Sequence, residues 1–461
     1  MQIKLYPHGS LKPLKRPTTA EDYMDGAKAA AAFLDMCAVE SKDGMYWDTG
    51  SEDPQLNLYL GSAGIVLFLL ELWRLCGEKQ YLEKAQKGCD YIIHAIGEFT
   101  DVHQITGKNV HPYNAENVNS LHYGYSGIAF ALLKMGQWSG IETYKEAAYL
   151  LTEQIAGSAK KDEHGVYWTG YSSITHDAGV ILYLLEAAKA FGNESWLLLA
   201  SEAGKSILRS GKDQGDGAVC YGDVYDSLNL FSENRANQVL WINFGSGCCG
   251  TVYTLAKLYE ETGIEEFRNG AEAGARFLMQ AADKMEQGLL IPLEWPRSKQ
   301  PVYYLGYCNG PVGSARLFML LEKLTKKACY KQFYEALYAG MESLRAPEYR
   351  SPGYWNTYSQ CCGTAGLVSG YLGGFEYLKD ANYLRLAKRA ADILLSAANY
   401  DGKAASWTSA AMRMDPDAGA QEPGYMRGAA GIGAALLQMY AVQKNAGGII
   451  HLPDDPYTIG G

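Results

Sequence analysis

The sequence predicts an all-α fold, an α/α toroid of seven inner and seven outer helices. Two observations support this prediction. A short glycine motif followed at once by an apolar helical run occurs seven times in the 461 residues, and a helical pattern with one charged face lies between successive motifs. A helix that is apolar nearly all round is buried, whereas an amphipathic helix faces water on one side. The chain is therefore expected to alternate inner and outer helices.

The inner helices are expected directly after each glycine motif. Six copies have the form Gly-x-x-Gly, and in the third copy His176 stands in place of the first glycine. Glycine admits close backbone approach, and the first turn of a helix leaves N–H groups without a helical partner. The inner helices should thus present their N-termini at the mouth of the ring. The closing glycines, 52 to 71 residues apart, are Gly64, Gly127, Gly179, Gly250, Gly313, Gly366 and Gly431.

The outer helices are expected in the charged segments between the motifs. Seven hairpins could stack as an open solenoid, but a solenoid needs polar terminal caps, which this sequence does not show. We therefore expect one closed toroid domain over residues 15–446 and a C-terminal tail over 447–461. The predicted outer helices cover residues 20–38, 78–96, 142–157, 194–208, 265–282, 330–344 and 382–398.

Charge and hydropathy narrow the range of partners and locations. The 51 acidic and 41 basic residues give a net charge of −10 and are spread along the chain. No basic stripe is present to neutralise a nucleic-acid backbone or an anionic membrane surface, so neither is an expected partner. The first residues lack the apolar core of a secretory signal, and no segment reaches the ~18 consecutive apolar residues of a membrane span. We expect a cytoplasmic protein.

Three of the ten cysteines stand at the expected helix mouths. Cys308 lies two residues before Gly310, and Cys361 and Cys362 directly precede Gly363, so consecutive repeats place thiols at neighbouring mouths. Cytosolic thiols stay reduced, which favours metal binding over disulfides. Three protein ligands with a fourth position open are typical of a catalytic zinc, and thiolates favour zinc over harder cations. The sequence predicts Zn²⁺ held by Cys308, Cys361 and Cys362.

Two further cysteines, Cys248 and Cys249, lie inside the fourth glycine motif. They follow the first glycine of their motif, whereas Cys361 and Cys362 precede theirs, so they stand one turn-position later and their side chains should point elsewhere. Either one of them reaches the metal as a fourth ligand, or both pack against the neighbouring helix as small buried residues.

These features resemble the LanC-like family, the lanthionine synthetase C cyclases and their relatives, over essentially the whole chain. Tyr307-Cys308-Asn309-Gly310, followed one repeat later by Cys361-Cys362-Gly363, is similar to the family's Cys-x-Gly and Cys-His-Gly zinc motifs. The resemblance implies a seven-hairpin toroid with zinc at its mouth. It also implies a Michael-type addition, in which a cysteine thiolate of the substrate attacks a dehydroamino acid and leaves a thioether.

The resemblance further implies the partners. The substrate would be a dehydrated precursor peptide or a small thiol such as glutathione. No dehydratase or kinase-like region is visible in the sequence, so the dehydrated peptide would come from a separate dehydratase. Because the family's histidine ligand is here Cys362, three thiolates on Zn²⁺ would leave a net charge of about −1 and make a further bound sulfur more electron-rich.

The sequence departs from the family at the proton donors. The histidine and the aspartate that the family uses align with Ser246 and Ser172. His176 and Asp177, at the third mouth, are the expected catalytic replacements, since an imidazole can act as a general acid near neutral pH. In the alternative interpretation His176 caps the helix and Asp177 stabilises its N-terminus. His122, two residues before Gly124, is a second candidate.

Two other functions remain open. α/α toroids also host glycoside hydrolases and lyases that work with paired carboxylates; Asp177 is the one acid inside a glycine motif, and Asp48, Asp226 and Glu294 lie in connecting segments. The third function is a non-catalytic zinc- or thiol-binding protein, which the serines at positions 172 and 246 favour.

Overall fold

The structure, a computed structural model, is mostly helical and forms two compact units. The first unit comprises Met1–His8, Ser158–Asn356 and Pro453–Pro456, and the second comprises Gly9–Gly157, Thr357–Leu452 and Tyr457–Gly461. Within these bounds the structure describes residues 5–7, 11–12, 14–51, 53–98, 118–226, 238–350, 357–412 and 415–460.

The described residues of the first unit form three helical hairpins. In each, an inner helix packs on the outer helix that follows it in sequence, and the middle inner helix, α9, also packs on the other two, α7 and α11. The hairpins are α7 (Asp177–Phe191) with α8 (Glu194–Arg209), α9 (Cys248–Thr262) with α10 (Glu265–Ala281), and α11 (Pro311–Thr325) with α12 (Ala328–Ser343).

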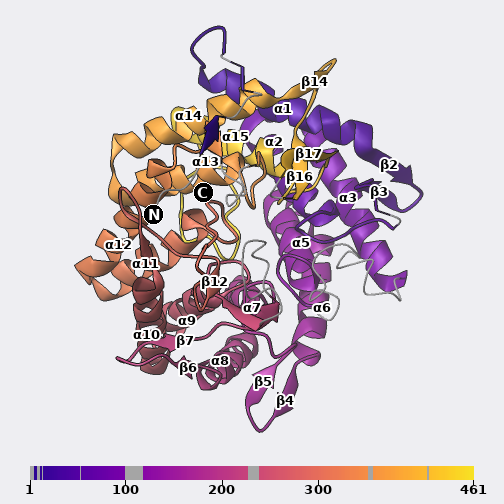
Figure 1. Cartoon of the computed structure of the whole chain (residues 1–461). Helices are drawn as coiled ribbons and strands as arrows, with labels where there is room; N and C mark the ends of the chain where they lie inside the picture. Colours follow the sequence, from indigo (N-terminus) through magenta and orange to yellow (C-terminus); the bar gives the residue numbers. More distant parts are fainter. Residues whose placement is uncertain are drawn as a thin grey trace. The chain divides into compact units, whose positions relative to one another are not determined.

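In the second unit the described helices form four hairpins, one of which pairs the first helix with the last. The first outer helix, α1 (Ala20–Cys37), packs on the last inner helix, α15 (Ala429–Lys444), and Figure 1 shows the two side by side. An open solenoid would leave its first and last helices apart, so this pairing favours the predicted closed arrangement. The other hairpins are α2 (Ser62–Cys76) with α3 (Lys79–Glu98), α5 (Tyr125–Ser139) with α6 (Glu142–Gly157), and α13 (Thr364–Leu378) with α14 (Ala381–Ala397).

Burial confirms the predicted alternation of inner and outer helices. In α2 every residue from Ser62 to Leu72 is buried. In α10 the buried positions recur every three or four residues, among them Phe267, Ala271, Ala275 and Leu278. An apolar stripe of this period is what a helix presents when one of its faces is packed and the other is in water.

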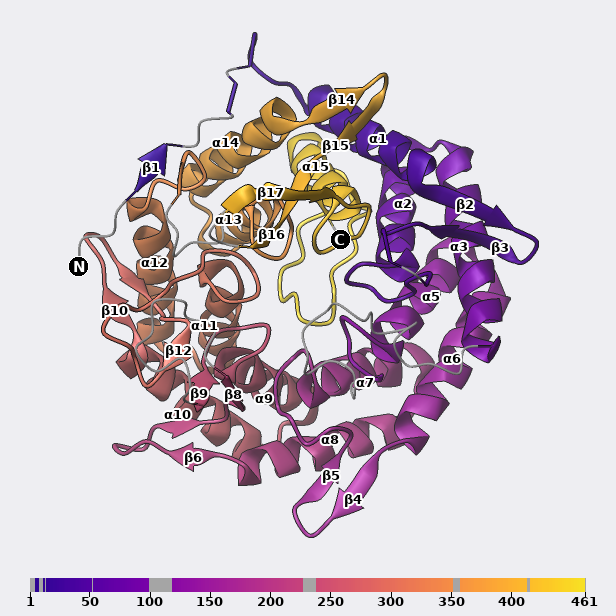
Figure 2. The same cartoon turned by 45° about the vertical axis from the view of Figure 1, so that its right-hand side comes forward.

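Short antiparallel hairpins extend from the helix ends. Figure 2 shows one of them, β4–β5, reaching beyond α8, on which β5 packs. One three-stranded sheet has the order β12-β9-β8. The strands are β1 (Tyr6–Pro7), β2 (Ala38–Ser41), β3 (Gly44–Trp47), β4 (Lys160–Asp162), β5 (Gly165–Tyr167), β6 (Lys212–Asp213), β7 (Val219–Cys220), β8 (Val224–Asp226), β9 (Gln238–Trp241), β10 (Asp283–Lys284), β11 (Leu289–Leu290), β12 (Glu294–Trp295), β13 (Tyr349–Arg350), β14 (Asn399–Asp401), β15 (Ala404–Ser406), β16 (Thr408–Met412) and β17 (Asp415–Gln421).

The glycine motifs let the loop before each inner helix fold against its first turn. A Cβ at the closing glycine Gly313 would collide with the carbonyl oxygen of Tyr307, and one at the opening glycine Gly363 would collide with that of Thr357. In both cases the carbonyl lies six residues earlier in the chain. Only glycine allows this approach, and the approach sets the position of the residues in between, which include Cys308 and Cys361.

The C-terminal segment 447–461 contacts inner helices. In the second unit, the Ile450 N–H donates to Glu71 Oε1 on α2 over 2.7 Å. Glu71 is fully buried, and burial raises the pKa of its carboxyl to about 8. In the first unit, Asp454 is fully buried and its carbonyl accepts a 3.0 Å hydrogen bond from Arg316 Nη1 on α11. Among the described helices, none is long and apolar enough to cross a membrane.

Candidate metal centre at the helix mouths

Backbone hydrogen bonds join the loops that precede successive inner helices. In the second unit, Cys361 N–H donates to the Met426 carbonyl (2.8 Å), Met426 N–H to that of Tyr59 (2.9 Å), and Tyr59 N–H to that of His122 (2.9 Å). Each of these residues stands two positions before the first glycine of its motif. The repeat thus holds equivalent residues in one hydrogen-bonded row at the helix mouths.

The first unit has a row of the same kind. Gly245 N–H donates to the Cys308 carbonyl over 2.6 Å, and Thr175 N–H donates to the Gly245 carbonyl over 3.1 Å. Gly245 and Cys308 also stand two positions before the first glycine of their motifs. A Cβ at Gly245 would lie 3.2 Å from the Cys308 Cα, so a small residue is needed next to Cys308. Cys308 and Cys361 therefore occupy equivalent positions in their repeats, as the sequence predicted.

Cys362 lies beside Cys361 at the mouth of α13. Its N–H donates to Ser359 Oγ (3.2 Å), and its thiol donates to Cys361 Sγ across 3.5 Å. This separation is far beyond the ~2.05 Å of a disulfide. Cys361 is 2% exposed, and Cys308 and Cys362 are partly exposed. The thiols are thus reduced, and two of them reach a surface.

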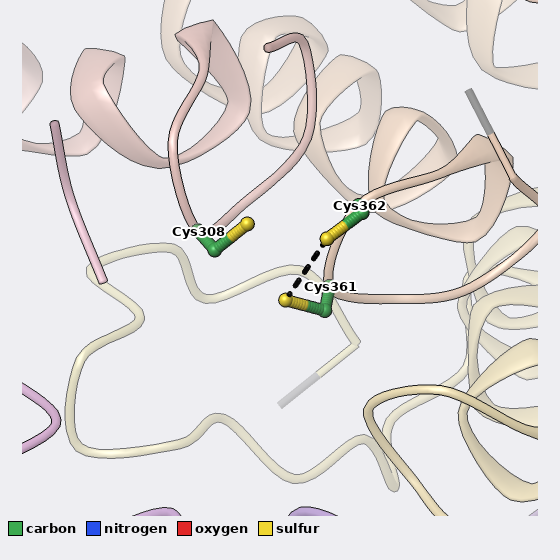
Figure 3. Close-up of side chains that lie close together, drawn as sticks. All are labelled: Cys308, Cys361 and Cys362. Atoms are coloured by element: carbon green, nitrogen blue, oxygen red, sulfur yellow. Dashed lines mark hydrogen bonds between the residues drawn. The ribbon is translucent and has the colours of Figure 1, made fainter. Parts of the chain in front are cut away.

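The three cysteines form a group that could hold a metal ion. The ligand atoms of Cys308, Cys361 and Cys362 all lie within 4.8 Å of one another, and Figure 3 shows their side chains. The donors are three sulfur atoms without a carboxylate. This soft donor set fits zinc and does not fit the oxygen-preferring Mg²⁺ or Ca²⁺.

A cation lies near Cys362. Arg427, the residue before the first glycine of the last motif, pairs with Glu422 through Nη2 and Oε1 at 2.9 Å. Burial lowers the pKa of the Arg427 guanidinium, but the charges of Glu422, Tyr59 and Cys362 outweigh burial and raise it above its ordinary value. Sequence reasoning missed Arg427, although its position in the motif matches that of Cys362.

His176 is buried at the mouth of α7. It is 2% exposed, and its Nδ1 lies 3.0 Å from Ser173 Oγ and 3.2 Å from Thr175 Oγ1. It is the N-cap residue of α7, but its side chain makes no capping hydrogen bond. The sequence left open that the His176 side chain caps the helix, and the structure shows that it does not. Its ring lies instead among hydroxyl groups.

Asp177 holds the loop before α7. Its carboxylate accepts hydrogen bonds from the N–H groups of Trp168, Thr169 and Gly170 and from the Thr169 hydroxyl, at 2.8 to 3.1 Å. Burial raises the pKa of this carboxyl, and the four hydrogen bonds oppose the shift only in part. These contacts are those of a residue that fixes a loop.

Asp223 is a partly buried acid that the sequence did not point to. Its carboxylate accepts hydrogen bonds from the N–H and hydroxyl of Ser172 and from the Ser173 N–H, at 2.8 to 3.1 Å. Burial raises the pKa of Asp223 to about 6 in spite of these bonds. The chain therefore places a carboxylate against Ser172, where the family pattern led us to expect one. No local signal could have found it, because it lies 51 positions further along.

The remaining candidates lie at other mouths or in the packing between helices. His122 is 1% exposed, and its ring meets Tyr59 edge-on at 6.4 Å. Cys248 and Cys249 are fully buried; Cys248 Sγ accepts from the Tyr221 N–H, and the Cys249 thiol donates to the Ser314 carbonyl. Among the described residues, the group that could hold a metal includes neither of these two cysteines.

Comparison with solved structures identifies the fold. Nisin cyclase matches with a TM-score of 0.62 at 15% identity, covering 93% of this chain and 95% of that one. The α-1,6-mannanase of Salegentibacter sp. HEL1_6 also matches, at a TM-score of 0.44 and 12% identity over 91% of this chain and 98% of its own, a likeness too low to inform function. The predicted α/α toroid is confirmed.

Comparison with models of known protein families shows to which family the chain belongs. No curated protein matches the chain. The family described as lanthionine synthetase C-like protein matches residues 52–449, a range that includes all seven glycine-led inner helices and the three cysteines. The chain belongs to the lanthionine synthetase C-like family.

Proposed function

We propose that this protein is a zinc-dependent cyclase-like enzyme that adds a cysteine thiolate to a dehydroamino acid. The grouping of Cys308, Cys361 and Cys362, with ligand atoms within 4.8 Å of one another, supports the proposal most strongly. Membership of the lanthionine synthetase C-like family and the fold shared with nisin cyclase also support it. The substrate would be a dehydrated peptide, made by a separate dehydratase, or a small thiol acting on such a peptide.

The three cysteines would hold the metal as thiolates. Zinc, when bound, would lower the pKa of a substrate thiol and keep it as a nucleophilic thiolate at neutral pH. Cys308 and Cys362 are partly exposed, which leaves room for a fourth ligand from the substrate. The Arg427 guanidinium lies close enough to Cys362 to offset part of the negative charge that gathers there.

The reaction requires a proton as well as a nucleophile. The thiolate attacks the β-carbon of dehydroalanine or dehydrobutyrine, the C–S bond forms, and the electrons of the double bond pass to an enolate. The enolate then takes a proton at the α-carbon. We propose His176 as the source of this proton, because its imidazole sits at a helix mouth in the unit that also carries Cys308. Asp177 would act indirectly, by fixing the loop before α7.

A defined pair of reactants tests this function. Purified protein is incubated with glutathione and a short synthetic peptide that contains one dehydroalanine, and the adduct is followed by mass spectrometry. We expect thioether formation well above the uncatalysed rate with wild type, and loss of that excess with Cys308→Ala. The control, Cys329→Ala, removes an exposed thiol on α12 and should leave the rate unchanged.

One result would refute the enzyme assignment. If the protein binds zinc tightly but accelerates no addition, with glutathione or with a cysteine inside the dehydrated peptide, the non-catalytic zinc- or thiol-binding alternative is the better account.

A further inference from the structure

A chain of side-chain hydroxyl groups links His176 to the mouth of α9. Thr175 Oγ1 lies 3.2 Å from His176 Nδ1 and donates to Ser246 Oγ over 3.4 Å. Ser173 Oγ lies 3.0 Å from both His176 Nδ1 and Thr175 Oγ1. All four residues belong to the first unit. Hydroxyl groups both donate and accept, so such a chain can pass a proton along its length.

Burial changes along the chain from one end to the other. His176, Ser173 and Thr175 are 2%, 0% and 8% exposed, whereas Ser246 is partly exposed. The Tyr171 ring lies over the His176 ring, with centroids 5.0 Å apart. The imidazole therefore has little direct access to a substrate, whereas the chain of hydroxyl groups ends at a residue that is partly exposed.

The exposed end of the chain lies next to a candidate zinc ligand. Ser246 follows Gly245, whose N–H donates to the Cys308 carbonyl over 2.6 Å. Thr175 N–H donates to the Gly245 carbonyl, so the backbone fixes Thr175 against the same loop. The two contacts hold the hydroxyl chain and Cys308 in one hydrogen-bonded row.

We propose that His176 protonates the enolate through Thr175 and Ser246, with Ser246 Oγ as the atom that gives its proton to the α-carbon. This inference rests on the proposed function. As the Ser246 proton moves to carbon, Ser246 takes the Thr175 proton and Thr175 takes the His176 Nδ1 proton. His176 goes from imidazolium to neutral imidazole and regains the proton that the substrate thiol released. One C–S and one C–H bond form, and the S–H bond and the C=C π bond are lost.

Three variants interrupt the relay at different points. Thr175→Val keeps the shape of the side chain and removes the middle hydroxyl, Ser246→Ala removes the end, and His176→Gln removes the source. General acid catalysis contributes on the order of 10²- to 10⁴-fold, so kcat should fall by at least about 10²-fold in each, with KM and zinc content unchanged. The control is Thr254→Val, which removes a fully buried α9 hydroxyl bonded to the Gly250 carbonyl, outside the relay.

The configuration of the product distinguishes a relay from a structural role. Delivery from Ser246 places the proton on one face of the enolate, so wild type should give one diastereomer. Without the relay, water protonates both faces, and the three variants should give mixtures. The double variant Thr175→Val/Ser246→His, which puts an imidazole directly at the mouth, should recover rate and a single diastereomer.

The hydrogen-bond chain is also tested apart from turnover. In protein labelled with ¹⁵N-histidine, Ser246→Ala should shift the His176 Nδ1 resonance, although Thr175 separates the two side chains. An unchanged resonance, or wild-type kcat with a single diastereomer in Thr175→Val and Ser246→Ala, would overturn the relay. A wild-type protein that forms no thioether would instead overturn the proposed function, and with it the delivery of the proton to carbon.

Discussion

Replacing Asp454 by alanine should destabilise the first unit strongly. The Asp454 side chain is 0% exposed and that of Arg316 is 6% exposed, with Arg316 Nη1 3.7 Å from Asp454 Oδ1. The Tyr307 hydroxyl donates to Asp454 Oδ2. Asp454 in the C-terminal segment thus supplies a buried carboxylate to two groups. One is the Arg316 guanidinium on α11, and the other is the Tyr307 hydroxyl in the loop before α11.

The size of the effect follows from the burial of both partners. Removing one member of a buried ion pair costs about 3–5 kcal/mol, because the other charge stays in a poorly solvated site. The Arg316 guanidinium does stack on the Tyr307 ring at 5.0 Å, but a cation–π contact is worth only about 0.5–2 kcal/mol and does not replace the carboxylate. Against a total stability of about 5–15 kcal/mol, this is a large loss.

Urea unfolding of wild type and variants measures the loss. Glu142→Ala, which breaks an exposed pair with Lys145 on α6, is the control and should cost under about 1 kcal/mol. A double-mutant cycle with Arg316→Met isolates the pair, and its coupling energy should account for most of the Asp454→Ala effect. A loss under about 1 kcal/mol for Asp454→Ala, equal to the exposed control, would show that this buried ion pair does not stabilise the first unit.

Three further predictions concern burial, packing and the unassigned thiols. Because burial raises the pKa of Asp223 from 3.8 to about 6, the folded chain binds more protons than the unfolded chain between these values. Wild type should therefore lose about 3 kcal/mol of unfolding free energy relative to Asp223→Asn as pH rises from about 3 to 7, and equal pH dependences of the two proteins in denaturant titrations across this range would contradict the shift. Gly313→Ala brings a Cβ against a carbonyl oxygen and should cost about 1–3 kcal/mol or more. Gly157→Ala, with nothing within 4 Å of its Cβ, should cost nothing measurable in the same thermal unfolding assay. Cys248→Ser and Cys249→Ser should keep the zinc of wild type by metal analysis, and loss of zinc in either would make that thiol a ligand.

The repeat made most of the fold predictable. Glycine motifs and helical periodicity are local signals, and they predicted the positions of both the inner and the outer helices. They also predicted that Cys308 and Cys361 occupy equivalent positions in their repeats, which the backbone hydrogen bonds between the loops explain. The pairing of α1 with α15 follows from the same count, because the seventh inner helix has no outer helix after it.

The surroundings of the site were less predictable, because long-range packing supplies them. Asp223 reaches Ser172 from the loop between β7 and β8, and Asp454 reaches Arg316 from 138 positions away. Nothing in the local sequence links these pairs. The segment 447–461, expected as a tail, has no periodic pattern, and its contacts depend on single carboxylates meeting groups on inner helices.

Metal analysis of purified protein is the most direct test of whether Cys308, Cys361 and Cys362 bind zinc together. We expect close to one zinc per chain in wild type and its loss in Cys308→Ala, Cys361→Ala and Cys362→Ala, while far-ultraviolet circular dichroism shows that each variant is folded. A wild type that contains no zinc although its thiols titrate as reduced, or a Cys308→Ala variant that keeps the full zinc content, would contradict this expectation.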